Sequence, residues 1–265
     1  TILSSEKTIL AEVRRELMAV REKYGDARRT QIIGGVSDFS VEDLIADEDM
    51  VVTVSNQGYI KRLPVSTYRK QRRGGRGVTG METKEEDFVK DLFIASAHQY
   101  ILFFTNKGRV YRAKAYELPD SGRDAKGQHV ANLLAFQPDE QIAQVLDIRD
   151  YAAAPYLVLA TRDGQVKKTR LEAFDSPRSG GLIAVNLRDG DELVGADLCS
   201  SADDLLLVSR KGMSVRFTAT DEALRPMGRA TSGVTGMKFR GGDWLLSMSV
   251  VPEGAEGIDV FVVFE

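Results

Sequence analysis

This sequence contains a single cysteine and only short apolar runs. A single cysteine, Cys199, excludes an intramolecular disulfide and a zinc site built on several cysteines, and it fits a reducing compartment. Apolar runs such as Tyr100 to Phe104 are short, whereas a membrane-spanning helix needs about twenty residues. The first residues include several charges and no apolar segment of the kind that a signal peptide carries. The sequence therefore predicts neither a membrane helix nor a secreted, disulfide-rich domain.

Proline is also scarce, and neither sign of charge dominates. Among 265 residues there are 7 Pro, 43% are hydrophobic and 28% are charged, which excludes collagen-like, low-complexity and disordered chains. A chain of this length can bury one large core or two smaller ones. The 36 basic and 39 acidic residues give a net charge of −3, an average that argues weakly against nucleic-acid binding. The distribution of the charges along the chain matters more than this average.

An amphipathic helix is predicted from Glu6 to Tyr24, ended by Gly25. Its apolar residues are spaced 3, 4, 3, 4, which is the narrow seam of a coiled coil; they are Leu10, Val13, Leu17, Val20 and Tyr24. Two heptads do not hold a coiled coil alone, so we expect the partner helix in a preceding segment. The alternative is a helix packed on the domain that follows. The start at Thr1 and a final unpartnered strand lead us to expect a fragment of a longer polypeptide.

The rest of the chain is a fourfold repeat. Each repeat has an apolar run, a turn glycine and a basic segment, and the turn glycines are Gly58, Gly108, Gly164 and Gly212, separated by 50, 56 and 48 residues. Four residues after each stands a cation: Arg62, Arg112, Lys168 and Arg216. A second glycine follows at Gly77, Gly127, Gly181 and Gly233, and then an aspartate at Asp87, Asp139, Asp191 and Asp243, spaced by 52 each time.

This pattern predicts an all-β fold of four-stranded blades. Each repeat contains a hairpin around its turn glycine, a loop of about a dozen residues and two more strands, and four strands in roughly 50 residues are typical of a propeller blade. We interpret Val41 to Met50 as the closing strand of an incomplete unit and Val260 to Phe264 as the first strand of a fifth. A solenoid β-helix is the structural alternative, but its repeat is much shorter.

The first repeat carries an unusually basic loop, Gln71-Arg72-Arg73-Gly74-Gly75-Arg76-Gly77. From Ser55 to Met81 there are seven cations and no acid. Arginine presents a planar fork of donors to phosphate oxygens, and glycine lets backbone N–H groups approach them. No bulky apolar residue interrupts the run, so it favours contact with a nucleic-acid backbone without base readout. A solvated basic loop with no partner is the alternative.

This heptapeptide resembles the gyrase A box, the signature of the C-terminal domain of the DNA gyrase A family, and all seven positions match the family pattern. The resemblance covers the whole chain, because the blades and the N-terminal helix also match. It implies a β-pinwheel, a propeller-like disc of usually six blades, over residues 34–265, preceded by the end of a coiled-coil arm and a linker over 1–33. With about four and a half repeats, the disc is expected to be incomplete at its C-terminal end.

The family also implies the function. The basic rim of the disc wraps duplex DNA without sequence preference and so enables negative supercoiling. The partners implied are double-stranded DNA, gyrase B and a second gyrase A subunit in a heterotetramer, in the cytoplasm and associated with the chromosome. The chain is not expected to be an enzyme by itself, because the cleavage tyrosine and the ATPase lie elsewhere. It needs no cofactor of its own, and ATP and Mg²⁺ are used in other parts of the intact topoisomerase.

We expect the other repeats to extend the DNA path as a curved track of cations. The predicted contacts are the box itself, the cations Lys61, Arg62, Arg112, Lys167, Lys168 and Arg216 after the turns, and Arg123, Lys126, Arg178, Arg225 and Arg229 in the later loops. The aspartates are interpreted as turn residues that bond nearby backbone. His98 and His129 have no ligands at metal spacing, and Trp244 is assigned to the core. No catalytic or metal residue is predicted.

Two other functions remain open from the sequence. A topoisomerase IV A subunit has similar blades, but its box is usually degraded, and the intact Gln71 to Gly77 favours gyrase. A propeller that binds only proteins would carry apolar rather than basic loops between its blades.

Overall fold

A computed structural model describes residues 5–26, 30, 41–68, 73–75, 77, 79–82 and 86–261. It divides into two units, residues 1–44 and 45–265. The first contains the helix α1 (Glu6–Tyr24), which ends where the Gly25 N–H donates to the Arg21 carbonyl at 2.7 Å. None of its side chains is buried, and Leu10, Leu17 and Tyr24 of the apolar seam are each more than 60% exposed. The helix therefore has the predicted bounds and an uncovered seam.

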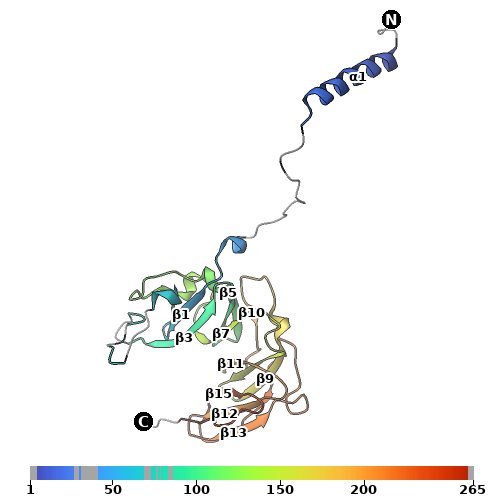
Figure 1. Cartoon of the computed structure of the whole chain (residues 1–265). Helices are drawn as coiled ribbons and strands as arrows, with labels where there is room; N and C mark the ends of the chain where they lie inside the picture. Colours follow the sequence, from blue (N-terminus) through green and yellow to red (C-terminus); the bar gives the residue numbers. More distant parts are fainter. Residues whose placement is uncertain are drawn as a thin grey trace. The chain divides into compact units, whose positions relative to one another are not determined.

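The second unit consists of antiparallel sheets that follow one another in an arc (Figure 1). The first two repeats supply the strands β1 (Asp49–Ser55), β2 (Tyr59–Pro64), β3 (Val89–Ser96), β4 (Tyr100–Thr105), β5 (Arg109–Lys114), β6 (Gln128–His129) and β7 (Ile142–Ile148). The third and fourth supply β8 (Tyr156–Thr161), β9 (Gln165–Arg170), β10 (Leu182–Ile183), β11 (Leu193–Cys199), β12 (Asp204–Ser209), β13 (Ser214–Thr218), β14 (Val234–Thr235) and β15 (Leu245–Val251). The short 3₁₀ turns are η2 (Val41–Leu44), η3 (Val65–Thr67), η4 (Ala115–Glu117), η5 (Val130–Asn132) and η6 (Leu171–Phe174). The all-β prediction is confirmed.

Each of the first three sheets contains one short strand that comes from the next repeat. The sheet orders are β3-β1-β2-β6, β10-β5-β4-β7, β11-β8-β9-β14 and β13-β12-β15. Thus β6, β10 and β14, each only two residues long, pair with the hairpin of the preceding repeat instead of their own. The sequence interpretation, four strands of one repeat in one blade, was wrong on this point. Among the described residues the fourth sheet has three strands, and no short strand pairs with β13.

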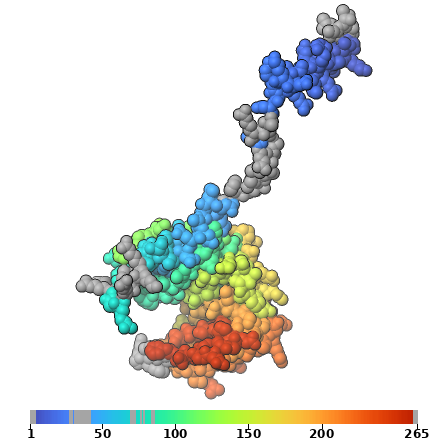
Figure 2. All heavy atoms as spheres, viewed as in Figure 1, coloured from blue at the N-terminus to red at the C-terminus, as the bar shows by residue number. Residues whose placement is uncertain are grey.

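The hydrophobic cores lie between successive sheets. Along β4, Ile101 and Phe103 pack toward the first blade, whereas Leu102 and Phe104 pack toward the third. In the same way Val158 and Ala160 of β8 join Leu205 and Leu207 of β12 in the next core. The central strands β4 and β8 are buried on both faces because their sheets are covered on both sides, whereas β12 of the fourth sheet alternates between buried and half-buried residues. Consecutive repeats therefore lie side by side, as the colour gradient of Figure 2 shows.

Neither of the two strands predicted at the ends forms among the described residues. Val41 to Met50 is not a closing strand: η2 occupies its start, and β1 begins only at Asp49. Four acids from Glu42 to Glu48 break the apolar alternation that a half-buried strand needs. Of the second segment, Val260 and Phe261 lie outside any strand and are exposed, while residues 262–264 fall outside the described part of the chain. Within the described residues, no helix is long and apolar enough to cross a membrane.

Candidate nucleic-acid interface

The basic loop leaves the first blade after β2 and η3. Gln71, Arg72 and Arg76 lie outside the described residues. Arg73 is exposed, and so are Gly74, Gly75 and Gly77. Gly74 and Gly77 have φ values of +85° and +72°, in the left-handed region that favours glycine, and a Cβ on either would meet nothing within 4 Å. The described part of the loop is therefore open to a ligand.

The loops of the later repeats differ from it in charge. Residues 115–127 carry Arg123 and Lys126, but also three acids. Arg123 forms an ion pair with Asp124 at 3.2 Å, and the Lys126 ammonium lies 3.3 Å from the centroid of the Tyr59 ring. An acid-free segment is therefore a property of the first loop alone among the four.

Lys61 was predicted to bind DNA, but in the structure it binds backbone carbonyls of the protein. Its side chain is fully buried, and Nζ donates to the carbonyls of Gly122 at 3.1 Å, Ala125 at 2.8 Å and Arg123. These three carbonyls belong to the loop of the following repeat. Burial lowers the pKa of Lys61, but the carbonyl oxygens satisfy its donors. Lys61 fastens one repeat to the next and is not part of the described surface.

Lys167 and Lys168 repeat this arrangement two blades later. The Lys167 Nζ donates to the carbonyls of Ala184 at 2.6 Å, Thr231 at 3.4 Å and Arg229. Lys168, also fully buried, donates to the Ala219 carbonyl at 2.5 Å and pairs with Asp221 at 2.8 Å. Both predicted contacts are corrected for the same reason, because the amines are bound mainly by the loop of the fourth repeat.

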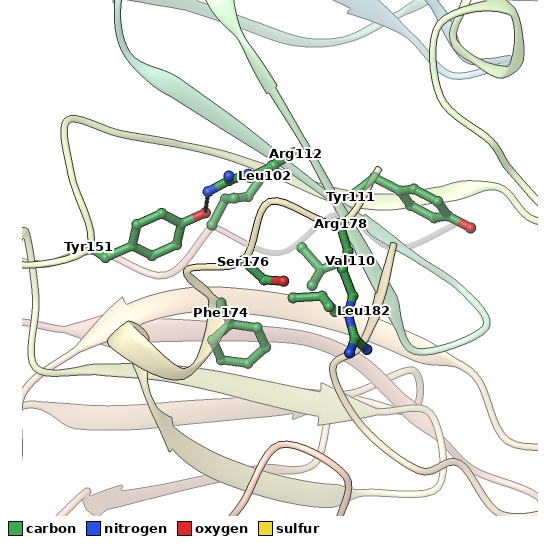
Figure 3. A pocket seen from close by; sticks show the side chains of 9 residues that line it. All are labelled: Leu102, Val110, Tyr111, Arg112, Tyr151, Phe174, Ser176, Arg178 and Leu182. Carbon is green, nitrogen blue, oxygen red and sulfur yellow. Dashed lines mark hydrogen bonds between the residues drawn. The ribbon is translucent and has the colours of Figure 1, made fainter. Parts of the chain in front are cut away.

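The arginines that follow the hairpin turns already form hydrogen bonds or ion pairs within the protein. Arg62 Nε donates to the Leu118 carbonyl at 2.8 Å, and Arg112 pairs with Asp175 at 3.0 Å and donates to the Tyr151 hydroxyl at 3.4 Å (Figure 3). Leu118 and Asp175 again belong to the following repeat. Arg216 has no following repeat in the described chain and pairs across its own hairpin with Asp204, at 2.7 Å, while 60% of its side chain stays exposed.

The remaining cations of the later loops are less constrained by contacts within the protein. Arg178 is exposed and lines the small hollow of Figure 3 with Val110 and Leu182. Arg225 is exposed as well. Arg229 is half-buried and donates to the Ala173 carbonyl at 3.2 Å, so it braces η6. Of the predicted cations beyond the box, Arg178, Arg216 and Arg225 are the most accessible.

The aspartates hold the hairpin turns in place. Asp87 Oδ1 accepts from the backbone N–H groups of Gln57 in the turn and of Phe88, each at 3.0 Å. Asp191 and Asp243 make the matching pair of bonds in their blades. Burial opposes the charged form, but the hydroxyl groups of Ser55 and Ser209 and these backbone donors together lower the pKa of Asp87 and of Asp243. The prediction of a bond to nearby backbone is confirmed for the N–H of the following residue, whereas the bond to the hairpin turn spans 28 to 32 positions of the chain.

The second blade departs from the regular spacing. Asp139 has a φ of +64°, and its neighbour Glu140 takes the buried position, accepting from Thr105 Oγ1 at 2.9 Å and from the Tyr111 hydroxyl at 2.6 Å. The buried carboxylate follows the second glycine by 13 residues here and by 10 in the other three repeats, a difference that the even spacing of 52 between the aspartates concealed.

Sequence reasoning missed one cluster. Trp244 is half-buried, and the guanidinium groups of Arg162 and Arg210 lie 4.8 and 4.6 Å from its ring centroid. The signal was present, since the residue that opens the hairpin turn is Asn in the first two repeats and Arg in the last two. Among the described residues, no group of His, Cys, Asp and Glu forms a metal site.

Comparisons with known proteins agree with this arrangement of repeats. The family model "DNA gyrase C-terminal domain, beta-propeller" matches residues 49–96, 99–147, 155–200 and 203–252, one match for each repeat. The chain is 64% identical to the DNA gyrase A protein of Streptomyces coelicolor over 258 residues, which cover 96% of this chain and 30% of that protein. It is 64% identical to the Mycobacterium tuberculosis gyrase A protein over 242 residues, or 91% of this chain and 29% of that protein.

Solved structures share the fold. The C-terminal domain of DNA topoisomerase IV superposes with a TM-score of 0.67 at 30% identity, covering 79% of this chain and 63% of that one. The DNA gyrase A C-terminal domain gives a TM-score of 0.60 at 26% identity, covering 76% and 64%. The chain thus spans about three tenths of the length of its curated relatives.

Proposed function

Because this chain belongs to the DNA gyrase C-terminal domain family, we propose that its blades bind duplex DNA without sequence preference and bend it along their outer loops. In the intact protein this wrapping would direct ATP-dependent negative supercoiling, together with gyrase B and a second gyrase A protein. DNA cleavage and ATP hydrolysis belong, in this proposal, to other parts of the enzyme, and this chain supplies only the binding surface. Its place is in the cytoplasm, on the chromosome.

One observation carries the proposal: the acid-free loop of the first repeat, in which the described residues 73–75 and 77 are exposed. Arg73 is open to solvent, and so are the glycines that follow it, Gly74 and Gly75. Five further cations of the acid-free segment, Arg62, Arg69, Lys70, Arg72 and Arg76, flank it in the sequence. A local charge of this density attracts phosphates even though the whole chain has a net charge of −3.

The loops that buried lysines hold in place would form a rigid path for the DNA. Bending a duplex of 20–30 base pairs costs about 1–6 kcal/mol, which many phosphate contacts have to offset. A loop that is already held in place loses little entropy on binding. Lys61, Lys167 and Lys168 therefore support the path from inside, by fixing the loop of the second repeat and the loop of the fourth, which carries the accessible Arg225.

The test replaces Arg72, Arg73 and Arg76 by Ala. Removing up to three phosphate contacts makes the slope of log affinity against log salt shallower by roughly 2–3 units, at about 0.9 for each phosphate. The control replaces three exposed cations of α1, Arg14, Arg21 and Lys23, by Ala, which changes the net charge equally. Fluorescence anisotropy with a labelled duplex at several salt concentrations measures both slopes.

We expect the control to keep the wild-type slope and random DNA to compete fully with any labelled sequence. Equal slopes for the box variant and the wild type would refute the assignment of the loop. A site that survives an excess of random DNA would refute binding without sequence preference.

A topoisomerase IV A subunit remains the second candidate, since the solved domain of that enzyme matches in fold. Identity of 64% to gyrase A proteins and the intact Gln71 to Gly77 favour gyrase. The assay that separates them is negative supercoiling of a relaxed plasmid by the intact enzyme, which requires a wrap.

A further inference from the structure

The hairpin turns of the third and fourth blades carry the cluster of Arg162, Trp244 and Arg210. Arg162 stands in the turn between β8 and β9, Arg210 in the turn between β12 and β13, and Trp244 directly precedes β15. The two guanidinium groups lie 4.8 and 4.6 Å from the centroid of the indole ring, which is the range of a cation–π interaction. One aromatic ring therefore holds two arginines that come from neighbouring blades.

Backbone hydrogen bonds fix all three residues. The Arg210 N–H donates to the Trp244 carbonyl at 3.0 Å, and the Leu245 N–H donates to the Arg162 carbonyl at 2.9 Å. Asp243 anchors the same segment, because its Oδ1 accepts from the N–H groups of Lys211 at 3.1 Å and Trp244 at 2.9 Å. The backbones of the three residues are thus held by the sheets, and the indole ring holds the two guanidinium groups.

The charge of the cluster is not neutralised internally. Among the described residues, no carboxylate lies within 4 Å of the Arg210 guanidinium, and Arg162 has one loose, exposed partner, Glu192, at 3.6 Å. The nearby cations Lys211, Lys238 and Arg240 are exposed. The carboxylate of Asp243, the nearest acid in the segment, is occupied by the two backbone donors and by Ser209 Oγ at 2.6 Å.

The fold does not need this cluster. The first two blades have Asn56 and Asn106 at the arginine positions, and Phe88 precedes β3 where Trp244 precedes β15. Their turns still make the same backbone bonds, Asn56 N–H to the Phe88 carbonyl at 2.9 Å and Asn106 N–H to the Gln141 carbonyl at 3.0 Å. The arginines of the last two blades and the tryptophan of the fourth therefore call for an explanation other than hairpin geometry.

We propose that Arg162, Trp244 and Arg210 form a second phosphate-binding site for the backbone of duplex DNA, at the turn edge of the third and fourth blades. The ring occupies the flat faces of the guanidinium groups, so their N–H edges are left for phosphate oxygens. Two forks from adjacent blades match two phosphates of a backbone without reading bases. The site rests on the proposed DNA-binding function and adds a contact at the far end of the repeats from the box.

Trp244 is the only tryptophan of the chain, so the site carries its own probe. The experiment titrates this chain with a random duplex of about 40 base pairs and follows tryptophan emission and the anisotropy of labelled DNA in parallel. We expect the emission of Trp244 to change and to saturate with the anisotropy. An unchanged emission at full DNA occupancy overturns the proposal.

The paired variant is Arg162→Gln with Arg210→Gln. It makes the slope of log affinity against log salt shallower by about 2 units and weakens binding at 0.1 M salt by about tenfold for each phosphate no longer bound. The control, Arg14→Gln with Arg21→Gln on α1, removes the same charge and is expected to behave as the wild type. Equal slopes for the paired variant and the wild type would overturn the site.

The box variant separates this inference from the proposed function. If DNA binds and the box variant has its predicted effect while the paired variant has none, only the second site is wrong. If the chain binds no DNA, both fail together. Should an acidic peptide, and not DNA, change the Trp244 emission, the cluster binds a protein segment and the phosphate assignment is overturned.

Discussion

Basic side chains have two different roles in this protein, and their charge alone does not distinguish the two roles. Lys61 and Lys167 have the same charge as the box arginines, yet each is buried and donates to three backbone carbonyls, most of them in the next repeat. Arg73 and Arg210 are exposed and have no carboxylate partner among the described residues. A buried cation on the strand after the turn is a structural fastener, and a cation in an open loop is a candidate contact for DNA.

Lys167 provides the first prediction. Replacing it by Met leaves three carbonyls without their donor, so we expect a loss of about 2 kcal/mol in the free energy of unfolding at pH 7. Burial, and to a lesser extent the charge of Arg229, lower the pKa of Lys167 from its usual 10.5 to about 8. Urea unfolding measures the loss, and Lys107→Met, at an exposed turn residue, is the control.

The same group predicts a pH dependence. Between pH 8 and 10.5 the unfolded chain holds the Lys167 proton and the folded chain releases it, so stability from this group rises with pH across that window and is constant below it. The wild type should therefore gain stability relative to the Met variant from about pH 8 upward, by up to about 3 kcal/mol. A gap that narrows as the pH rises would contradict the assignment.

At the scale of elements, the two-residue strands hold the blades together. Gly127 precedes β6 with a φ of +80°, and a Cβ there would clash with the Ile60 carbonyl. Gly190 has nearly the same φ, +81°, with nothing within 4 Å. We expect Gly190→Ala to cost about 1–2 kcal/mol from the left-handed backbone alone, and Gly127→Ala to cost clearly more, because the short strand must also move.

Thermal unfolding of the two alanine variants is the measurement. Both share the backbone penalty, so their difference isolates the contact between the short strand and the preceding hairpin. Equal midpoints would show that β6 contributes little to holding the first two blades.

The helix α1 is an element of another kind, since it buries no side chain and exposes its apolar seam. Removing residues 1–44 should therefore leave the unfolding midpoint of the blades nearly unchanged, because no core cluster includes a described residue of that segment. A drop of several degrees would show that the helix packs on the blades after all. Differential scanning calorimetry of the two chains decides it.

At the scale of the whole molecule, the proposed wrapping function predicts that supercoiling and strand passage can be separated. Restored to an intact enzyme, the Ala variant of Arg72, Arg73 and Arg76 should lose negative supercoiling, because DNA no longer turns back across the cleavage gate. Passage between separate duplexes needs no wrap, so decatenation should persist. A plasmid supercoiling assay and a decatenation assay on the same preparation compare the two activities.

Wild-type supercoiling in this variant, together with a reduced salt slope, would mean that the box binds DNA without directing the wrap. Loss of both activities would mean that the variant damages the enzyme in general.

The repeat, the all-β class, the helix and the basic loop were all predictable from the sequence, because each rests on local periodicity. The linear sequence contains each of these signals directly: apolar alternation, turn glycines such as Gly58 and Gly108, and the acid-free segment from Ser55 to Met81. Even the bonds of Asp87 and Asp191 to the N–H of the next residue followed, since a short carboxylate bonds nearby backbone.

Only the tertiary structure decided which partners the residues find. The exchange of β6, β10 and β14 between repeats, the burial of Lys61 and Lys168, and the shift from Asp139 to Glu140 depend on residues at least 29 positions apart in the chain. The cluster at Trp244 arises in the same way, because its two arginines come from different blades. A linear pattern records where a charge stands in the chain, whereas folding determines whether that charge meets a carbonyl, an aromatic ring or solvent.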